Sequence, residues 1–234
     1  MNTPWLTVLS LLLTFSAVTA SGARASATAA SEAAVSQSVP LAQDAVLEPN
    51  AAQRQAQAVI NGFHQALLAA ATEHAEAADR FVQLAPLVNQ VFNTGWIARL
   101  SLGRNWKTLG PEPQDQFRSL LSQLIAATYA DRFAHGATVR FAVESVDTGR
   151  RGPVVRCQLI RDTGAPVRLD YHFRDGKIYN VVADGVSDLS LRRADYNNVV
   201  KQQGFDALLV QLRDQLQTLI GGETEPAATN EANS

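Results

Sequence analysis

The spacing of apolar residues predicts helices in the first half of the chain. Apolar residues recur at every third or fourth position in a first segment, at Ala56, Val59, Ile60, Phe63 and Leu67. Asn50 precedes this segment and belongs to the residue types that favour helix N-caps. The sequence therefore predicts a helix that begins near residue 51 and buries one face.

A second apolar stripe follows, at Phe81, Leu84, Val88 and Phe92. Pro86 lies inside it, and a proline within a helix removes a backbone N–H and clashes with the preceding turn. We therefore expect a kink or a break at Pro86. A short third helix is predicted near residues 94–102 and ends at Gly103.

The strongest helical pattern begins at Pro111, a residue type that is favoured in the first turn of a helix. Its apolar face consists of Phe117, Leu120, Leu121, Leu124, Ile125, Tyr129 and Phe133. Gly136 is expected to end this helix.

The pattern then changes from helical spacing to alternation. Four runs rich in β-branched and aromatic residues occupy 138–146, 153–161, 167–174 and 177–183, and short segments of turn residues separate them. In the first run Val139, Phe141 and Val143 share a face. The third run alternates Val167, Leu169, Tyr171 and Phe173 with polar residues. These features predict a four-stranded antiparallel meander.

Two helices are predicted to close the chain, at 191–203 and from Phe205 onward. The last one carries a stripe formed by Phe205, Leu208, Leu209, Leu212, Leu216 and Leu219. Helices before and after a single antiparallel sheet predict an α+β fold, in which N-terminal and C-terminal helices pack with the sheet.

The ends of the chain differ from this domain. The segment from Leu6 to Ala20 carries no charge and ends in a small-residue cleavage pattern, which predicts a signal peptide (1–20) cleaved near Ala20. The first five residues lack Lys and Arg, so a buried N-terminal helix is the alternative. Residues 21–50, rich in Ala, Ser and Gln, and the polar residues 221–234 are predicted to be disordered. The globular domain is therefore expected at 51–220.

Charge and candidate ligands exclude several functions. The chain has 20 basic and 22 acidic residues, and one basic and six acidic residues lie outside 51–220, which leaves 19 against 16 in the domain. No run of like charge indicates nucleic-acid binding. The single cysteine, Cys157, cannot form an internal disulfide, and the four histidines fall in separate predicted elements. We therefore expect no metal and no cofactor.

Two pairs of residues could carry chemistry, although simpler interpretations exist. Asp170 and His172 share one strand face and could form an acid–base pair, but a solvated outer face is the simpler interpretation. Asp184 and Gly185 could place a carboxylate, but such a pair usually forms a turn. We therefore predict no enzymatic activity. The apolar faces alone are compatible with a filled core as well as with a lipid-holding cavity.

Several short blocks resemble a known family. LGRNWK at 102–107 is followed by Pro111, Glu112 and Phe117; GKIYNVVADGVS at 176–187 is followed by LRRADY at 191–196 and GFDAL at 204–208. In this order the blocks resemble the MlaC family of periplasmic phospholipid-transport proteins, also called the toluene-tolerance family. The likeness spans roughly residues 86–219 and departs from the family pattern at Gly110 and Asn180, among others. A hopanoid-associated relative, the HpnM group, has similar blocks.

The resemblance implies a periplasmic carrier that takes phospholipid between an inner-membrane ABC transporter complex and an outer-membrane lipoprotein complex. The acyl tails are then expected between helices and sheet. The apolar residues expected to contact them are Phe92, Leu100, Leu120, Leu124, Phe133, Val139, Phe141, Val167, Leu169, Tyr171, Phe173 and Val182. The alternatives are a carrier of hopanoids or other lipids, and a periplasmic interaction module with a filled core.

Overall fold

The computed structural model describes residues 49–133 and 139–221. The predicted signal peptide, all of the predicted leader except residues 49 and 50, the tail from residue 222 and the expected helix end at Gly136 lie outside the described residues. The elements are α2 (Ala51–Glu73), α3 (Ala77–Val91), α4 (Thr94–Leu102), η2 (Asn105–Thr108), α5 (Pro111–Arg132), β1 (Val139–Gly149), β2 (Gly152–Arg161), β3 (Val167–Arg174), β4 (Lys177–Ala183), β5 (Val186–Ser187), α6 (Asp188–Gln203) and α7 (Phe205–Gly221).

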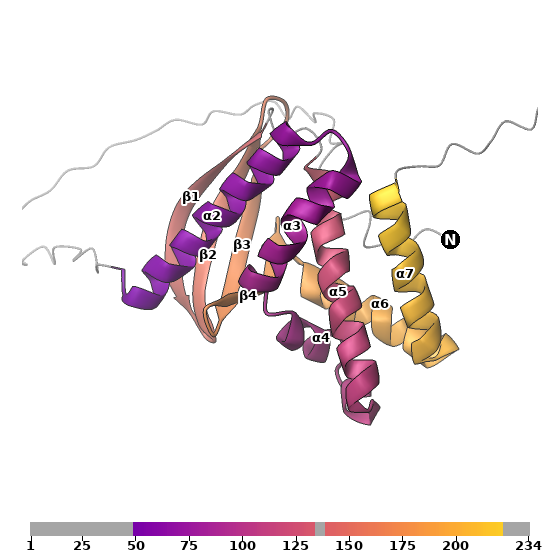
Figure 1. The fold of residues 1–234 in the computed structure, drawn as a ribbon. Helices are drawn as coiled ribbons and strands as arrows, with labels where there is room; N and C mark the ends of the chain where they lie inside the picture. The colour runs from indigo at the N-terminus through magenta and orange to yellow at the C-terminus, as the bar shows by residue number, and fades with distance from the viewer. Residues whose placement is uncertain (1–48, 134–138, 222–234) are drawn as a thin grey trace, which may run out of the picture.

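These elements form one antiparallel sheet and a group of helices, so the predicted α+β class is confirmed. The strands lie in chain order, β1-β2-β3-β4-β5. The helix α2 crosses one face of the sheet, and α3, α5 and α7 lie beside one another at its side (Figure 1). The helices α4 and α6 contact each other and β4 at the lower end of this group.

A capping box starts α2 where the sequence predicts a helix. The Asn50 side chain accepts a hydrogen bond from the Gln53 backbone N–H at 3.0 Å, and the Asn50 N–H donates to the Gln53 side chain at 2.8 Å. Gln53 also donates to the backbone oxygen of Val146 at 2.9 Å. The cap therefore fixes the start of α2 and ties it to β1.

We expect Asn50→Ala to lower the free energy of unfolding by about 1 kcal/mol, because the Gln53 backbone N–H at the start of α2 loses its acceptor. Asn61→Ala is the matched control, because Asn61 is exposed in the middle of the same helix. There alanine is the better helix former and should stabilise by up to about 0.5 kcal/mol. Urea denaturation measures both variants, and equal effects would contradict the role of the cap.

The predicted kink or break at Pro86 is not where the helices separate. Pro86 lies inside α3, and the chain leaves the helical conformation earlier, between His74 and Glu76. The side chain of Arg80, which is 3% exposed, explains this position. Its Nη1 donates to the His74 oxygen at 2.9 Å and to the Ala75 oxygen, and its Nε donates to Ala130 at 2.6 Å. One guanidinium thus holds the α2–α3 break against α5.

The sheet has five strands where four were predicted. Asp184 and Gly185 both have positive φ, 47° and 85°, and form the tight turn that the sequence favours. This turn reverses the chain, so that Val186 and Ser187 pair with the end of β4 as the short strand β5. The Asp184 carboxylate accepts a hydrogen bond from the Arg168 N–H at 2.9 Å, which joins this turn to β3.

Two β-bulges shift the register of the sheet. In β1 the pairing skips one residue between Val143 and Ser145, and in β4 Tyr179 is the extra residue between Ile178 and Asn180. The hairpin between β1 and β2 is packed closely against β3, because a Cβ at Gly152 would lie 2.5 Å from the Phe173 oxygen. Glycine is therefore required at residue 152.

The ends of two helices differ from the prediction by a few residues. The helix α5 ends at Arg132, and α6 begins at Asp188, three residues before the predicted start. Ser187 caps α6 by accepting from the Ser190 N–H at 3.2 Å, and Asn180 accepts from Ser187 Oγ and from the Leu189 N–H. These bonds satisfy backbone N–H groups of the first turn, so the helix starts earlier.

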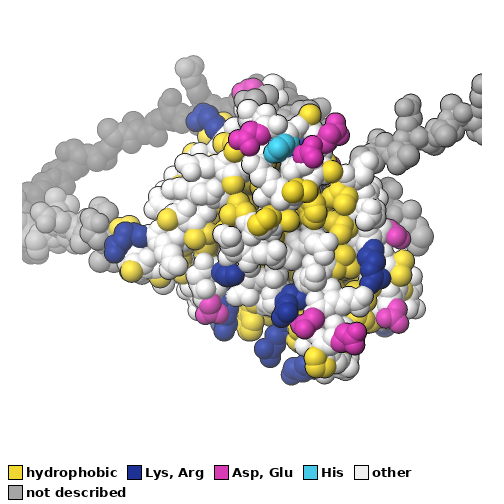
Figure 2. Space-filling model, viewed as in Figure 1, with side chains coloured by type: hydrophobic (Ala, Val, Ile, Leu, Met, Phe, Trp, Pro, Cys, Tyr) yellow, Lys and Arg dark blue, Asp and Glu magenta, His cyan; other side chains and the backbone are white. Residues whose placement is uncertain are grey.

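Most large apolar side chains of the described residues lie in one core between the sheet and the helices. Hydrophobic side chains also gather on the face where α2 and α3 lie, with charged groups toward the periphery (Figure 2). Val82 on α3 is 70% exposed. Across the described ranges, 49–133 and 139–221, no helix has the length and apolar character needed to cross a bilayer.

Candidate functional site

Aromatic rings from α2, α5 and β1 form a closed circuit inside the domain. Ring centroids lie 5.0 Å apart for Phe63 and Tyr129, 6.2 Å for Tyr129 and Phe133, and 5.6 Å for Phe133 and Phe141. His64 stacks on Phe141 at 3.7 Å and completes the circuit at 6.4 Å from Phe63. We call these five residues, together with Phe92 and Tyr171, the aromatic cluster.

The aromatic cluster is a filled interior in this conformation. Phe63, Phe92 and Tyr171 are each less than 5% exposed, and Phe133 and Phe141 are partly buried at its edge. Edge-to-face contacts, such as that of Phe63 with Tyr129 at 86°, are the favoured geometry for aromatic pairs. The cluster therefore joins α2 and α5 to the sheet through apolar contacts.

One polar contact lies inside this apolar interior. His64 Nε2 is 3.0 Å from the Tyr171 hydroxyl, and His64 is 5% exposed. Burial lowers the pKa of His64 to about 3 and raises the pKa of Tyr171 above its usual value. Both groups are therefore neutral at neutral pH, and their hydrogen bond satisfies two polar groups that water cannot reach.

Eleven of the twelve residues predicted to contact lipid belong to the core or pack against it. Leu120, Leu124, Val167, Leu169 and Phe173 are buried beside the aromatic cluster members Phe92 and Tyr171, while Leu100, Phe133, Val139 and Phe141 are partly buried against the same core. The helices and the sheet thus bring these side chains to one interior. Whether they contact a lipid stays a prediction.

Val182 is the exception, and its placement corrects the prediction. It pairs with Asp170, whereas its neighbours Val181 and Ala183 pair with Tyr171 and Leu169 on the core face. The bulge at Tyr179 causes this shift, because one extra residue moves the rest of the strand to the opposite face. Val181 therefore occupies the core position that the sequence assigned to Val182.

Three members of the aromatic cluster were missing from the prediction: Phe63, His64 and Tyr129. Phe63 and Tyr129 lie on the predicted apolar stripes of their helices, so the helical spacing contained a signal for them. His64 carried no such signal, because a histidine on a helix is usually partly exposed. Its burial results from the packing of α2 on β1 and β2, where His64 stacks on Phe141.

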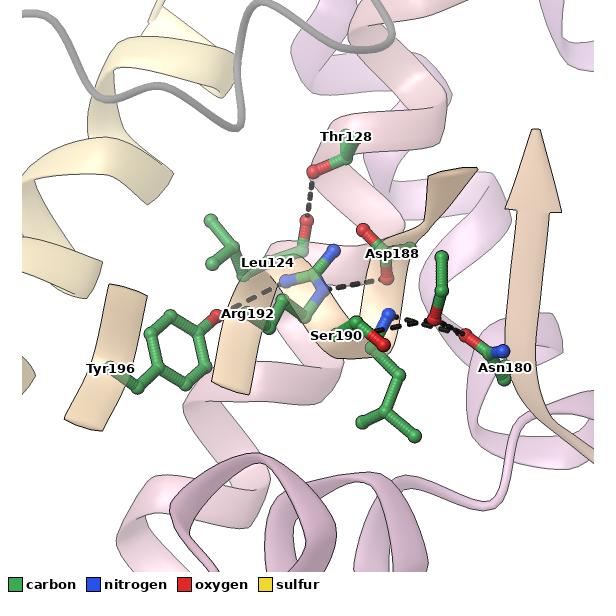
Figure 3. Close-up of polar contacts among 9 residues, drawn as sticks. Leu124, Thr128, Asn180, Asp188, Ser190, Arg192 and Tyr196 are labelled. Atoms are coloured by element: carbon green, nitrogen blue, oxygen red, sulfur yellow. Dashed lines mark hydrogen bonds and ion pairs between the residues drawn. The ribbon is translucent and has the colours of Figure 1, made fainter. Parts of the chain in front are cut away.

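A buried charged cluster lies next to the aromatic cluster, at the contact between α5 and α6. Arg192 is 3% exposed; its Nε donates to Asp188 at 2.7 Å and its Nη1 donates to the Tyr196 hydroxyl at 3.2 Å (Figure 3). Although burial lowers the pKa of Arg192, the Asp188 carboxylate and these hydrogen bonds raise it on balance. Asp188 and Arg192 both affect the pKa of Tyr129, which connects the two clusters.

The opposite face of the sheet contains a separate pocket of about 310 Å³. It is lined by residues of the β1–β2 hairpin, including Arg150 and Arg151, and by His172, Phe173 and Tyr179. The rings of His172 and Tyr179 are 6.2 Å apart, and burial lowers the pKa of His172. His172 is partly buried, on the outer face of the sheet that the sequence predicts to be solvated.

The candidate acid–base residue Asp170 is also partly buried. Its Oδ1 lies 3.8 Å from Arg156 Nε, so an arginine faces this carboxylate.

Among residues 49–133 and 139–221, no group of three or more His, Cys, Asp or Glu side chains is arranged to hold a metal ion. What the interior provides is a filled apolar core of aromatic and aliphatic side chains with a few buried polar groups, such as His64.

Comparison with known proteins identifies the family. A family model described as MlaC protein matches residues 57–214. The intermembrane phospholipid transport system binding protein MlaC of Haemophilus influenzae is 26% identical over 121 residues, which cover 48% of this chain and 56% of that protein. The chain therefore spans little more than half the length of this curated relative.

The fold also matches a solved structure. It is that of a phospholipid-binding protein from Ralstonia solanacearum in complex with a phospholipid, with a TM-score of 0.59 and 22% sequence identity. The match covers 70% of this chain and 98% of that one, and it concerns the fold alone. Because the family model covers well over half of the sequence, the resemblance of the short blocks is confirmed: this chain belongs to the MlaC protein family.

Proposed function

We propose that this protein binds a phospholipid by its acyl tails and carries it between membranes without a catalytic step. The observation that carries the proposal is the aromatic cluster, a continuous apolar interior built from α2, α5, β1 and β3 in an MlaC-family fold. The printed names of the two similar proteins, a phospholipid transport protein and a phospholipid-binding protein, support the choice of ligand.

The hydrophobic effect explains why a carrier needs such an interior. Each methylene that leaves an apolar environment for water costs about 0.8 kcal/mol, so one long acyl chain bare in water costs on the order of 10 kcal/mol. In the described conformation the core side chains fill their own interior. Tails must therefore displace these contacts, and their burial offsets the free energy of opening.

The proposal includes a location and partners. Residues 1–20 act as an export signal cleaved near Ala20, residues 51–220 form the lipid-binding domain, and the mature protein works in the periplasm. It exchanges phospholipid with an inner-membrane ABC transporter complex and an outer-membrane lipoprotein complex. Apolar walls tolerate different chain lengths, since one methylene discriminates only weakly between ligands.

The test is lipid retention by protein purified from membrane-containing cells. Native mass spectrometry should show an added mass that organic extraction identifies as a two-tailed phospholipid. Phe141→Gln should reduce retention about 10-fold, because it places an amide in the apolar interior. Arg140→Gln is the matched control, since Arg140 is the neighbouring strand position and is exposed.

Three outcomes would count against the proposal. Protein that stays empty after incubation with phospholipid vesicles has no carrier function of this kind. A hopanoid as the main extracted lipid would replace phospholipid as the ligand. Equal retention by Phe141→Gln and Arg140→Gln would remove the aromatic cluster from the binding site.

A further inference from the structure

Arg132, in the last turn of α5, has a buried donor without an acceptor. Its Nη1 is inaccessible to solvent and has no hydrogen-bond partner among the described residues. A buried donor in this state is destabilising by about 1–3 kcal/mol, and more when the group is charged. The position near the negative end of the α5 dipole favours a cation, but it supplies no acceptor for Nη1.

The charges around Arg132 leave a positive excess. Burial lowers the pKa of Arg132 to about 10; Asp188 and Asp131 raise it, and Arg192 lowers it further. Arg80 and Arg132 both act on the pKa of Asp131, which burial raises. Three arginines and two carboxylates therefore surround the last turns of α5. Asp188 accepts from Arg192 at 2.7 Å, and Arg132 Nη1 has no hydrogen bond to Asp188 or to any other described residue.

This positive group lies near Tyr129, a member of the aromatic cluster. Thr128 is one helical turn before Arg132 and donates to the Leu124 oxygen, and Figure 3 draws this turn of α5 together with the Arg192 guanidinium. Tyr129, which belongs to the aromatic cluster, is three residues before Arg132. The charges of Arg192 and Arg132 both act on the pKa of its hydroxyl. Arg132 is therefore a cationic group close to the aromatic cluster, on the helix that carries Tyr129.

We propose that Arg132 binds the phosphate group of the lipid whose tails the aromatic cluster receives, with Arg192 held beside it by Asp188 and Tyr196. This inference rests on the proposed lipid-binding function and deepens it. Guanidinium groups bind phosphate oxygens through two parallel hydrogen bonds, which a carbonyl or hydroxyl of a phosphate-free lipid cannot reproduce. The orphaned Nη1 supplies one such donor.

The experiment compares two lipids with identical tails, a phosphatidylglycerol and the corresponding diacylglycerol. Delipidated full-length protein is incubated with vesicles that contain both, and the bound lipids are extracted and quantified. Wild-type protein should prefer the phospholipid. Arg132→Gln should reduce this preference at least about 10-fold, the equivalent of one charge-assisted hydrogen bond, and should leave diacylglycerol binding unchanged.

Two further variants separate a phosphate contact from a structural role. Arg132→Lys keeps the charge without the fork and should restore part of the preference. Arg118→Gln is the matched control: Arg118 lies on the same helix, is half exposed and pairs with Asp115 at the surface. It should keep the wild-type preference. Millimolar inorganic phosphate should leave phospholipid occupancy unchanged, because the tails contribute most of the affinity.

The outcomes distinguish this inference from the proposed function. Binding of neither lipid by the wild type would overturn both. Equal binding of both lipids by the wild type, or an unchanged preference in Arg132→Gln, would overturn only the role of Arg132. An equal loss of both lipids in Arg132→Gln would make the residue structural, and displacement of phospholipid by inorganic phosphate would make the site one for free phosphate.

Discussion

Acidification from about pH 7 to about pH 4.5 is expected to lower the free energy of unfolding by about 2 to 3 kcal/mol through His64 alone. Burial lowers the pKa of His64 from 6.5 to about 3 in the folded state. Between these values the unfolded chain binds a proton at His64 and the folded protein does not. Protons therefore favour the unfolded state, and stability falls as the pH drops below about 6.5.

The variant that tests this effect replaces His64 and Tyr171 together. The double substitution His64→Phe and Tyr171→Phe removes the titrating ring and its hydroxyl partner, and leaves no unpaired group in the core. Urea denaturation across this pH range should show a smaller acid loss in the double variant, by about 2 to 3 kcal/mol. Protonation of carboxylates lowers the stability of both proteins equally, so it cancels in the difference between them. Parallel stability curves would show that His64 is not held neutral by burial.

Asp188→Ala is expected to destabilise the protein by about 3 kcal/mol, because the buried Arg192 guanidinium loses the carboxylate at 2.7 Å. Arg192→Met should have a smaller effect. Asp188 is 44% exposed at its side chain, so water solvates its carboxylate after the arginine is removed. The order of the two effects follows from which partner is buried.

The double variant with both substitutions should recover part of the loss in Asp188→Ala, because an apolar side chain then replaces the buried charge. The surface pair of Arg118 and Asp115 provides the control. With both side chains at least half exposed, Asp115→Ala should change stability by less than about 1 kcal/mol. Thermal unfolding and urea denaturation measure the cycle, and additive effects of the two substitutions would show that the pair does not act as a unit.

The sequence predicted most elements of the fold because burial imposes a period on each of them. The stripe from Phe117 to Phe133 matches α5, and the alternation from Val167 to Phe173 matches β3. Errors arose where contacts distant in sequence decide the geometry. The α2–α3 break depends on Arg80 and on its bond to Ala130, which helical spacing does not reveal.

The same distinction applies to the candidate site. Apolar periodicity predicted which faces are buried, but not which side chains meet. Val182 was placed on the wrong face because alternation in β4 breaks at the bulge at Tyr179. Arg132 and Arg192 are absent from the predicted lipid contacts, because arginine in a helix is normally a surface residue. Only their position between α5 and α6 in the folded protein makes them part of an interior.

The order of the strands has a consequence for how the protein reaches this structure. Each strand pairs with its neighbour in the chain, so the sheet can form through a series of short loop closures with little loss of entropy. The helix α2 packs on β1 and β2, although three helices and a 3₁₀ turn separate them along the chain. The contacts of α2 with the strands join residues far apart in the chain, such as His64 and Tyr171, which are 107 positions apart. Among the contacts that surround the aromatic cluster, they require the longest loop closure. The interior that we assign to lipid is therefore expected to be completed late in folding, after the sheet has formed.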